Sequence, residues 1–197
     1  MSDRAVIWND IIAGPEAERM LNAALENVAS GLSKMAGQII YHTMPEINLL
    51  TFDRVTARYN DLEAETVGVY LEIQSGLHGW ALLMLPLAFA LNLADWVMNK
   101  PQGTATGLGQ IEKSALAEVG NVTLAYFLNA LAVLTHRPEI LMPSPPFVMV
   151  DMLGAILEVI LTPMAASRDD LLIIETNLQD KAEAMQACFW VLPQLAE

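Results

Sequence analysis

The pattern of apolar and polar residues along the chain predicts helices that alternate with groups of strands. Helices are expected at residues 15–36, 87–100, 108–134 and 150–164. Runs rich in β-branched and aromatic residues predict strands at 38–44, 47–59, 65–76, 77–86, 169–179 and 185–193. A Ser-Gly pair at 75–76 predicts a tight turn between two of these strands, and the proline-rich residues 139–146 are expected to be extended.

A loop at residues 101–109, rich in glycine and threonine, divides the chain into two similar parts. A helix, strands and a second helix precede it, and a helix, an extended segment, a helix and strands follow it. The segments YLEIQSGLHGWALLMLP and IIETNLQDKAEAMQACFWVLP resemble each other, because both end in a hydrophobic strand and a proline. We therefore expect a single domain over residues 1–197, with pseudo-repeat halves at about 14–100 and 104–193.

Composition narrows the classes of partner. The chain is 54% apolar, with a mean hydropathy of +0.37, and its net charge is −13. Disordered acidic chains contain fewer apolar residues than this. Ten basic residues against 23 acidic ones argue against a nucleic-acid surface and against binding to anionic membranes. We therefore expect a folded protein that binds neither nucleic acid nor an anionic lipid surface.

Location follows from the apolar segments and the cysteine count. Residues 74–94 carry no charged side chain, but turn residues and Pro86 divide them into a strand and a helix, so we expect buried core rather than membrane insertion. The N-terminus has no signal-peptide pattern. Cys188, the single cysteine, excludes an intrachain disulfide and favours a cytoplasmic location. It lies in an apolar strand, which indicates a buried inert thiol.

One polar stripe on the helix at 108–134 is a candidate for chemistry. Ser114, Glu118 and Asn121 stand at positions i, i+4 and i+7, within roughly 60° of one another around the axis. Spacing alone is more typical of the ordinary solvated face of an amphipathic helix than of an active site. The three histidines are scattered without metal-ligand spacing, and the 101–109 loop lacks the phosphate-binding glycine motifs.

The motifs around this stripe carry a family resemblance. Ser114-x3-Glu118-x2-Asn121, followed after 21 residues by Pro143, resembles the signature of the CheC/CheX/FliY family of chemotaxis phosphatases. The linked segments are EKSALAEVGN, LNALAVLT, MPSPP, VDMLGAILEVIL, LLIIETNL and FWVLP, and they extend from about residue 108 to 192. The resemblance implies an α/β fold of two pseudo-symmetric halves, in which two long helices and shorter ones pack on a largely antiparallel sheet.

The resemblance also implies a substrate and roles for the stripe. The substrate would be a CheY-type response regulator phosphorylated on aspartate. Asn121 would orient the attacking water, and Glu118 would pair with a lysine of the regulator. Ser114 and Pro143 would be supporting residues. The protein would need no cofactor of its own, because the regulator is expected to hold the Mg²⁺.

The first half departs from the family pattern. Asn22 and Glu26 occupy the start of a first motif, but Ala29 stands where its asparagine would be. We therefore expect one active site, in the second half, and leave open any role of the degenerate one. The alternative is a non-catalytic adaptor that binds a regulator, a flagellar-switch protein or a CheD-type deamidase. The identity of the regulator, an output in motility and the oligomeric state stay open.

Overall fold

The fold is a single antiparallel sheet with helices on both faces. The structure, a computed structural model, describes residues 8–9, 11–12, 14, 16–74, 77–136, 143–165, 169–180 and 186–194. The helices are α2 (Ala17–Ala36), α3 (Phe52–Thr56), α4 (Leu87–Val97), α5 (Gln110–Leu134) and α6 (Leu153–Ala165). The strands are β1 (Ile40–His42), β2 (Glu46–Thr51), β3 (Glu65–Ile73), β4 (Gly79–Pro86), β5 (Phe147–Met152), β6 (Asp170–Asp180) and β7 (Gln186–Pro193).

The strand order repeats itself about the middle of the sheet. Within the described residues, the order is β1-β6-β7-β4-β3-β5, with β2 also paired to β6, and every pairing is antiparallel. At the centre β4 pairs with β7, with Gly79 opposite Pro193 and Met84 opposite Cys188. Each half of the chain supplies one hairpin, and each hairpin receives its outer strand from the other half. This exchange explains why the two halves form one sheet rather than two.

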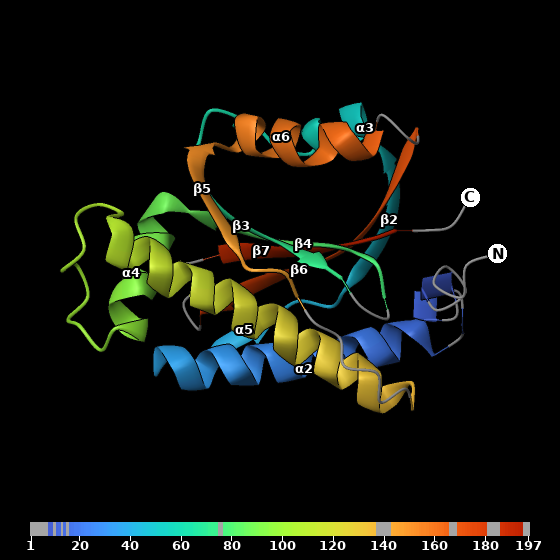
Figure 1. Cartoon of the computed structure of the whole chain (residues 1–197), viewed down its shortest axis with the longest axis horizontal. Helices are drawn as coiled ribbons and strands as arrows, with labels where there is room; N and C mark the ends of the chain where they lie inside the picture. The colour runs from blue at the N-terminus through green and yellow to red at the C-terminus, as the bar shows by residue number, and fades with distance from the viewer. Residues whose placement is uncertain are drawn as a thin grey trace.

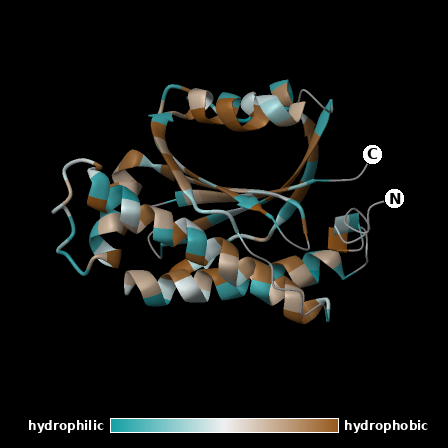
Figure 2. Ribbon diagram, in the orientation of Figure 1, coloured by the Kyte–Doolittle hydropathy of each residue, from teal (hydrophilic) through white to brown (hydrophobic). Residues whose placement is uncertain are grey.

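The helices divide unequally between the two faces of the sheet. α2, α4 and α5 cover one face, and α3 and α6 cover the other (Figure 1). Successive residues of a strand point to opposite faces, so Val69 of β3 faces α5 while Tyr70 faces α6. Apolar residues, coloured brown in Figure 2, occur along the strands and on the helices of both faces. The buried residues form two clusters, so the core has two layers, one on each face of the sheet.

The predicted fold class is confirmed: an α/β protein of two pseudo-symmetric halves with two long helices on an antiparallel sheet. The boundaries of the halves stay a prediction. The uncharged segment 74–94 divides at Pro86 into β4 and α4, as expected. Residues 75–76 and half of 139–146, namely 139–142, lie outside the described residues.

Two boundaries were predicted wrongly. Residues 47–59 are not one strand, because the chain turns into α3 after Thr51 and buries Val55 among residues of α6. Arg58 then donates to Glu175 of β6 through two nitrogens, at 2.7 and 2.5 Å, which ties this turn to the sheet. Residues 150–164 are not wholly helical, because the backbone of residues 147–152 pairs with β3 and the helix begins only at Leu153.

One helix of the described chain, α5, is long and apolar enough to cross a membrane by length and composition alone. Half of its most apolar stretch is buried inside the protein. That degree of burial is typical of the core helix of a folded domain.

Candidate functional site

The start of α5 is held in place by a loop that a buried carboxylate anchors. Asp95 of α4 is fully buried and accepts the backbone N–H groups of Thr104 at 2.8 Å and Ala105 at 3.0 Å. The N–H of Gly109, at the N-cap position of α5, donates to the Glu112 carboxylate at 3.1 Å. The 101–109 loop is therefore held at its middle and at its last residue, and α5 leaves it in a defined direction.

The inner face of α5 packs at close range on the sheet and on α2. Leu116, Val119 and Phe127 are completely buried. Gly120 brings the helix backbone so near β3 that a Cβ atom there would lie 2.4 Å from Cγ1 of Val69. These contacts prevent α5 from rolling on its axis, which fixes the direction of the side chains on its outer face.

The outer face of α5 carries the predicted polar stripe. Glu118 is exposed and Asn121 is partly exposed. Among the residues that the structure describes, neither side chain has a hydrogen-bond partner. Ser114 is also exposed, but its Oγ donates to the carbonyl oxygen of Gln110 at 2.9 Å. The structure therefore brings Glu118 and Asn121 together on one surface with their polar atoms available.

A shallow hollow of about 420 Å³ adjoins this stripe at its Ser114 end. Lys113, Ala117 and Val148 of β5 contribute to its lining, together with Ser114. Sequence reasoning did not find this hollow, because Val148 is far from α5 in the sequence. It did not single out Asp95 either, although a lone acid in an uncharged helix before a glycine-rich loop is a usable signal.

Pro143 lies at the edge of the sheet, not on the α5 surface. It forms an isolated antiparallel bridge with Ile73 at the end of β3. The next residue, Ser144, donates its N–H to the Glu72 carbonyl at 2.8 Å and accepts the Glu72 N–H on its hydroxyl at 2.9 Å. Pro143 thus shapes the approach to β5, and its supporting role in chemistry stays a prediction.

The corresponding surface of α2 differs from that of α5. Asn22 donates to the Glu26 carboxylate at 3.4 Å, so these two polar groups contact each other. Ala29 is buried at 6% exposure and offers no polar group. The second-half helix therefore presents Glu118 with an amide three residues later, whereas the first-half helix has the buried Ala29 at the corresponding position and its acid contacts Asn22.

The described residues include no group of three or more His, Cys, Asp or Glu side chains that could hold a metal ion. A carboxylate accepts hydrogen bonds, and a carboxamide both donates and accepts them. Placed one turn apart on a ridge, such groups contact a second macromolecule more readily than an enclosed small molecule. Fold and surface together define an α/β domain with an exposed polar face on its second long helix.

Comparison with known proteins agrees with this class. No family model matches the sequence. The CheY-P phosphatase CheC of Bacillus subtilis is 25% identical over 176 residues, which are 87% of this chain and 83% of that protein. The crystal structure of Thermotoga maritima FliY has a TM-score of 0.70 at 22% identity, covering 93% of this chain and 88% of that one. The CheX–CheY–BeF3–Mg²⁺ complex from Borrelia burgdorferi matches with a TM-score of 0.56 at 14% identity, covering 87% and 96%.

The sequence match to CheC and the shared fold confirm the predicted resemblance to the CheC/CheX/FliY family. The roles of Glu118, Asn121, Ser114 and Pro143 stay predictions, because similarity at this level concerns the family and the fold.

Proposed function

We propose that this protein is a CheC-like phosphatase that accelerates loss of phosphate from the phospho-aspartate of a CheY-type response regulator, in chemotaxis or two-component signalling. The observation that carries the proposal is the pair Glu118 and Asn121, aligned on the outer face of α5 and free of intramolecular hydrogen bonds in the described chain. The similarity to a CheY-P phosphatase and to a CheX bound to CheY supports a regulator of this type as the partner.

The chemistry requires orientation more than new functional groups. The regulator is expected to supply the Mg²⁺ and the phosphoryl group, so the missing component is a water in line with the phosphorus. The Asn121 carboxamide accepts a hydrogen bond from that water through its oxygen and donates one to a phosphoryl oxygen through its nitrogen. The water oxygen bonds to phosphorus, and the bond from phosphorus to the aspartate oxygen breaks. The aspartate leaves as a carboxylate, and both protons of the water remain on the inorganic phosphate.

Glu118 has a different role in this proposal. Its exposed carboxylate pairs with a lysine of the regulator and sets the register in which α5 enters the regulator's site. One helical turn separates it from Asn121, so correct pairing at Glu118 also positions the carboxamide. Such positioning is effective only on a rigid element, and the packing of Gly120 against Val69 supplies that rigidity.

Ser114 and Pro143 support this surface without contacting the reacting atoms. The Ser114 hydroxyl is engaged with its own helix at Gln110, so it contributes a small polar contact beside the hollow rather than a nucleophile. Pro143 directs the chain that leads into β5, whose Val148 lines the same hollow. We place the reaction in the cytoplasm.

The test is the decay of a phosphorylated CheY-type regulator with and without the protein. We expect the wild type to accelerate decay and Asn121→Ala to return it to the intrinsic rate. Asn129→Ala is the matched control, because Asn129 is an exposed asparagine further along the same helix. If no cognate or surrogate regulator decays faster with the wild type, the enzyme proposal is wrong.

A non-catalytic adaptor is the second candidate function. The similarity to FliY, at a TM-score of 0.70, and the incomplete polar set on α2 favour it. An adaptor would bind a regulator, a flagellar-switch protein or a CheD-type deamidase without changing phosphate decay. Stable binding to a phosphorylated regulator whose lifetime is unchanged would select this candidate over the phosphatase.

A further inference from the structure

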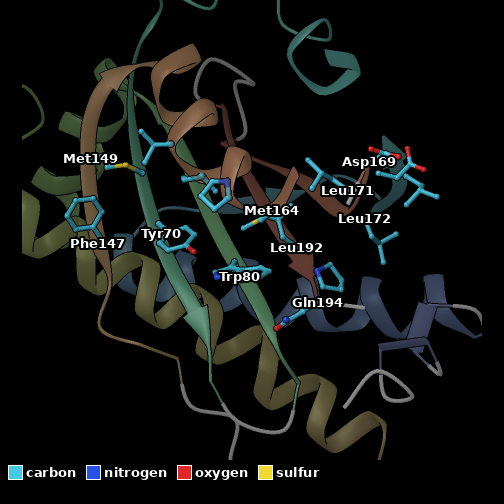
Figure 3. Close-up of a pocket in the computed structure, with 16 residues that line it drawn as sticks. Tyr70, Trp80, Phe147, Met149, Met164, Asp169, Leu171, Leu172, Leu192 and Gln194 are labelled. Atoms are coloured by element: carbon cyan, nitrogen blue, oxygen red, sulfur yellow. The ribbon is translucent and has the colours of Figure 1, made fainter. Parts of the chain in front are cut away.

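A largely apolar, half-open pocket lies on the face of the sheet opposite the α5 surface. Its volume is about 800 Å³, and it opens between the second half of α6 and the strands beneath it. Figure 3 shows Tyr70, Trp80, Met164 and Leu192 gathered around this space. The pocket is separate from the proposed phosphatase surface, and the proposed function makes no use of it.

The lining includes large apolar side chains that are well exposed to solvent. Phe147, Leu49 and Val159 are 61%, 59% and 62% exposed, and all three line the pocket. They come from β5, β2 and α6, so the fold gathers them from distant parts of the chain. An apolar pocket lined by side chains from several elements is a common setting for a ligand site.

The shape favours a small molecule over a protein surface. Val159, Ile160 and Pro163 of α6 form the roof, and Trp80 and Leu192, which lie opposite each other on β4 and β7, form part of the floor. An occupant must therefore enter a slot between helix and sheet. The volume is within the range of about 300–1,000 Å³ that is typical of small-molecule pockets.

Two aromatic residues add hydrogen-bonding groups to the apolar floor. In the described part of the chain, neither the Tyr70 hydroxyl nor the Trp80 indole N–H has a hydrogen-bond partner. Burial raises the pKa of Tyr70 to about 12, so its hydroxyl remains a neutral donor at physiological pH. An occupant with a carbonyl, hydroxyl or amine acceptor would satisfy these donors.

The charge of the lining determines which molecules are accepted. Asp169 and Asp170 are exposed and contribute carboxylates to the lining, and none of its described residues is basic. A chain of net charge −13 adds to the repulsion of anions. Fatty acids and other anionic amphiphiles are therefore disfavoured, whereas neutral and cationic molecules are not.

We propose that this pocket binds a neutral or cationic aromatic molecule of drug-like size, at a site distinct from the α5 surface. The ligand's rings contact Trp80, Phe147 and the α6 roof, its acceptor contacts Tyr70, and any positive charge faces Asp169 and Asp170. This site needs no phosphorylated partner for occupancy, so its test is independent of the phosphatase proposal.

Two probes that differ by one charge test the proposal on the full chain. N-phenyl-1-naphthylamine is neutral, and 8-anilinonaphthalene-1-sulfonate is the same ring system with a sulfonate. We expect saturable fluorescence enhancement with one neutral probe per chain, and at least tenfold weaker binding of the sulfonate. The double substitution Asp169→Asn and Asp170→Asn should narrow that difference. No saturable binding of the neutral probe, or equal affinity for both probes, overturns the proposal.

Substitutions at exposed positions locate the probe without threatening the fold. Phe147→Asp should weaken binding of the neutral probe at least tenfold. Met152→Asp is the control, since Met152 is 51% exposed on the same strand and outside the lining. Val159→Asp, on α6, tests the roof of the pocket if Phe147→Asp fails to fold. Equal binding by the variants Phe147→Asp, Val159→Asp and Met152→Asp refutes the site. A wild-type dimer that Phe147→Asp dissociates also refutes it, by showing a subunit interface there.

Discussion

The contact between Gly120 and Val69 determines how closely α5 approaches the sheet, and Gly120→Ala tests it. The added Cβ would lie 2.4 Å from Cγ1 and 3.1 Å from Cβ of Val69, well inside van der Waals contact. Val69 is completely buried and its β-branched side chain has little freedom to rotate, so the helix must lift. Overpacking of this kind costs up to about 3 kcal/mol, and replacing glycine in a helix returns about 1 kcal/mol. We expect a net loss of about 2 kcal/mol in the free energy of unfolding.

A double-mutant cycle separates this contact from other effects. Val69→Ala removes Cγ1 and makes room for the new methyl group, at the cost of a cavity in the wild-type background. We expect the double variant to be no less stable than Val69→Ala alone, which corresponds to a favourable coupling of about 2–3 kcal/mol. Urea unfolding of the four proteins, followed by circular dichroism, measures it. If Gly120→Ala is neutral and shows no coupling with Val69→Ala, α5 does not rest on β3 as described.

Three further predictions concern the anchor, alkaline stability and docking. Asp95→Asn should lower the free energy of unfolding by about 1–3 kcal/mol and speed amide hydrogen exchange in the loop after α4. The asparagine side chain cannot accept two backbone N–H groups as well as the carboxylate does. Unchanged hydrogen exchange in this loop would contradict the anchoring role. Burial raises the pKa of Tyr70 and of Cys188. Their contribution to stability is therefore complete below about pH 8.5 and is lost as the pH rises through their folded-state pKa values. A urea midpoint that stays constant as the pH is raised from about 8 to about 11 would contradict this. Glu118→Ala should raise the KM for the phosphorylated regulator with little change in kcat. Steady-state kinetics in which kcat falls and KM stays unchanged would contradict a docking role for Glu118.

The large elements could be predicted from the sequence because each carries a strong local pattern. The two long helices have caps and apolar faces, and Gly37 ends α2 with the positive φ of 63° that such a stop requires. The wrong boundaries fall where long-range pairing decides the structure. Residues 150–152 suit a helix locally but pair with β3, and Val55 belongs to a short helix because it packs against α6.

The candidate site was predictable only in part, for a similar reason. Glu118 and Asn121 share a helix, so spacing alone predicts that they face the same way. The hollow beside them and the pocket beneath α6 each combine residues from several elements, such as Tyr70 with Phe147, which the sheet register brings opposite each other. The role of Asp95 depends on backbone groups of a loop, and residue types do not reveal such partners.

The most direct test of the central claim is the first-order decay rate of a phosphorylated CheY-type regulator at saturating protein, for wild type and Asn121→Ala. Affinity for the beryllofluoride-activated regulator is measured alongside it. We expect the rate enhancement to fall by about 10²-fold, as when one positioned polar group is lost from other active sites, with affinity within a few fold of wild type. An Asn121→Ala protein that accelerates decay as fast as the wild type would contradict the assignment of this residue and, with it, the proposed mechanism.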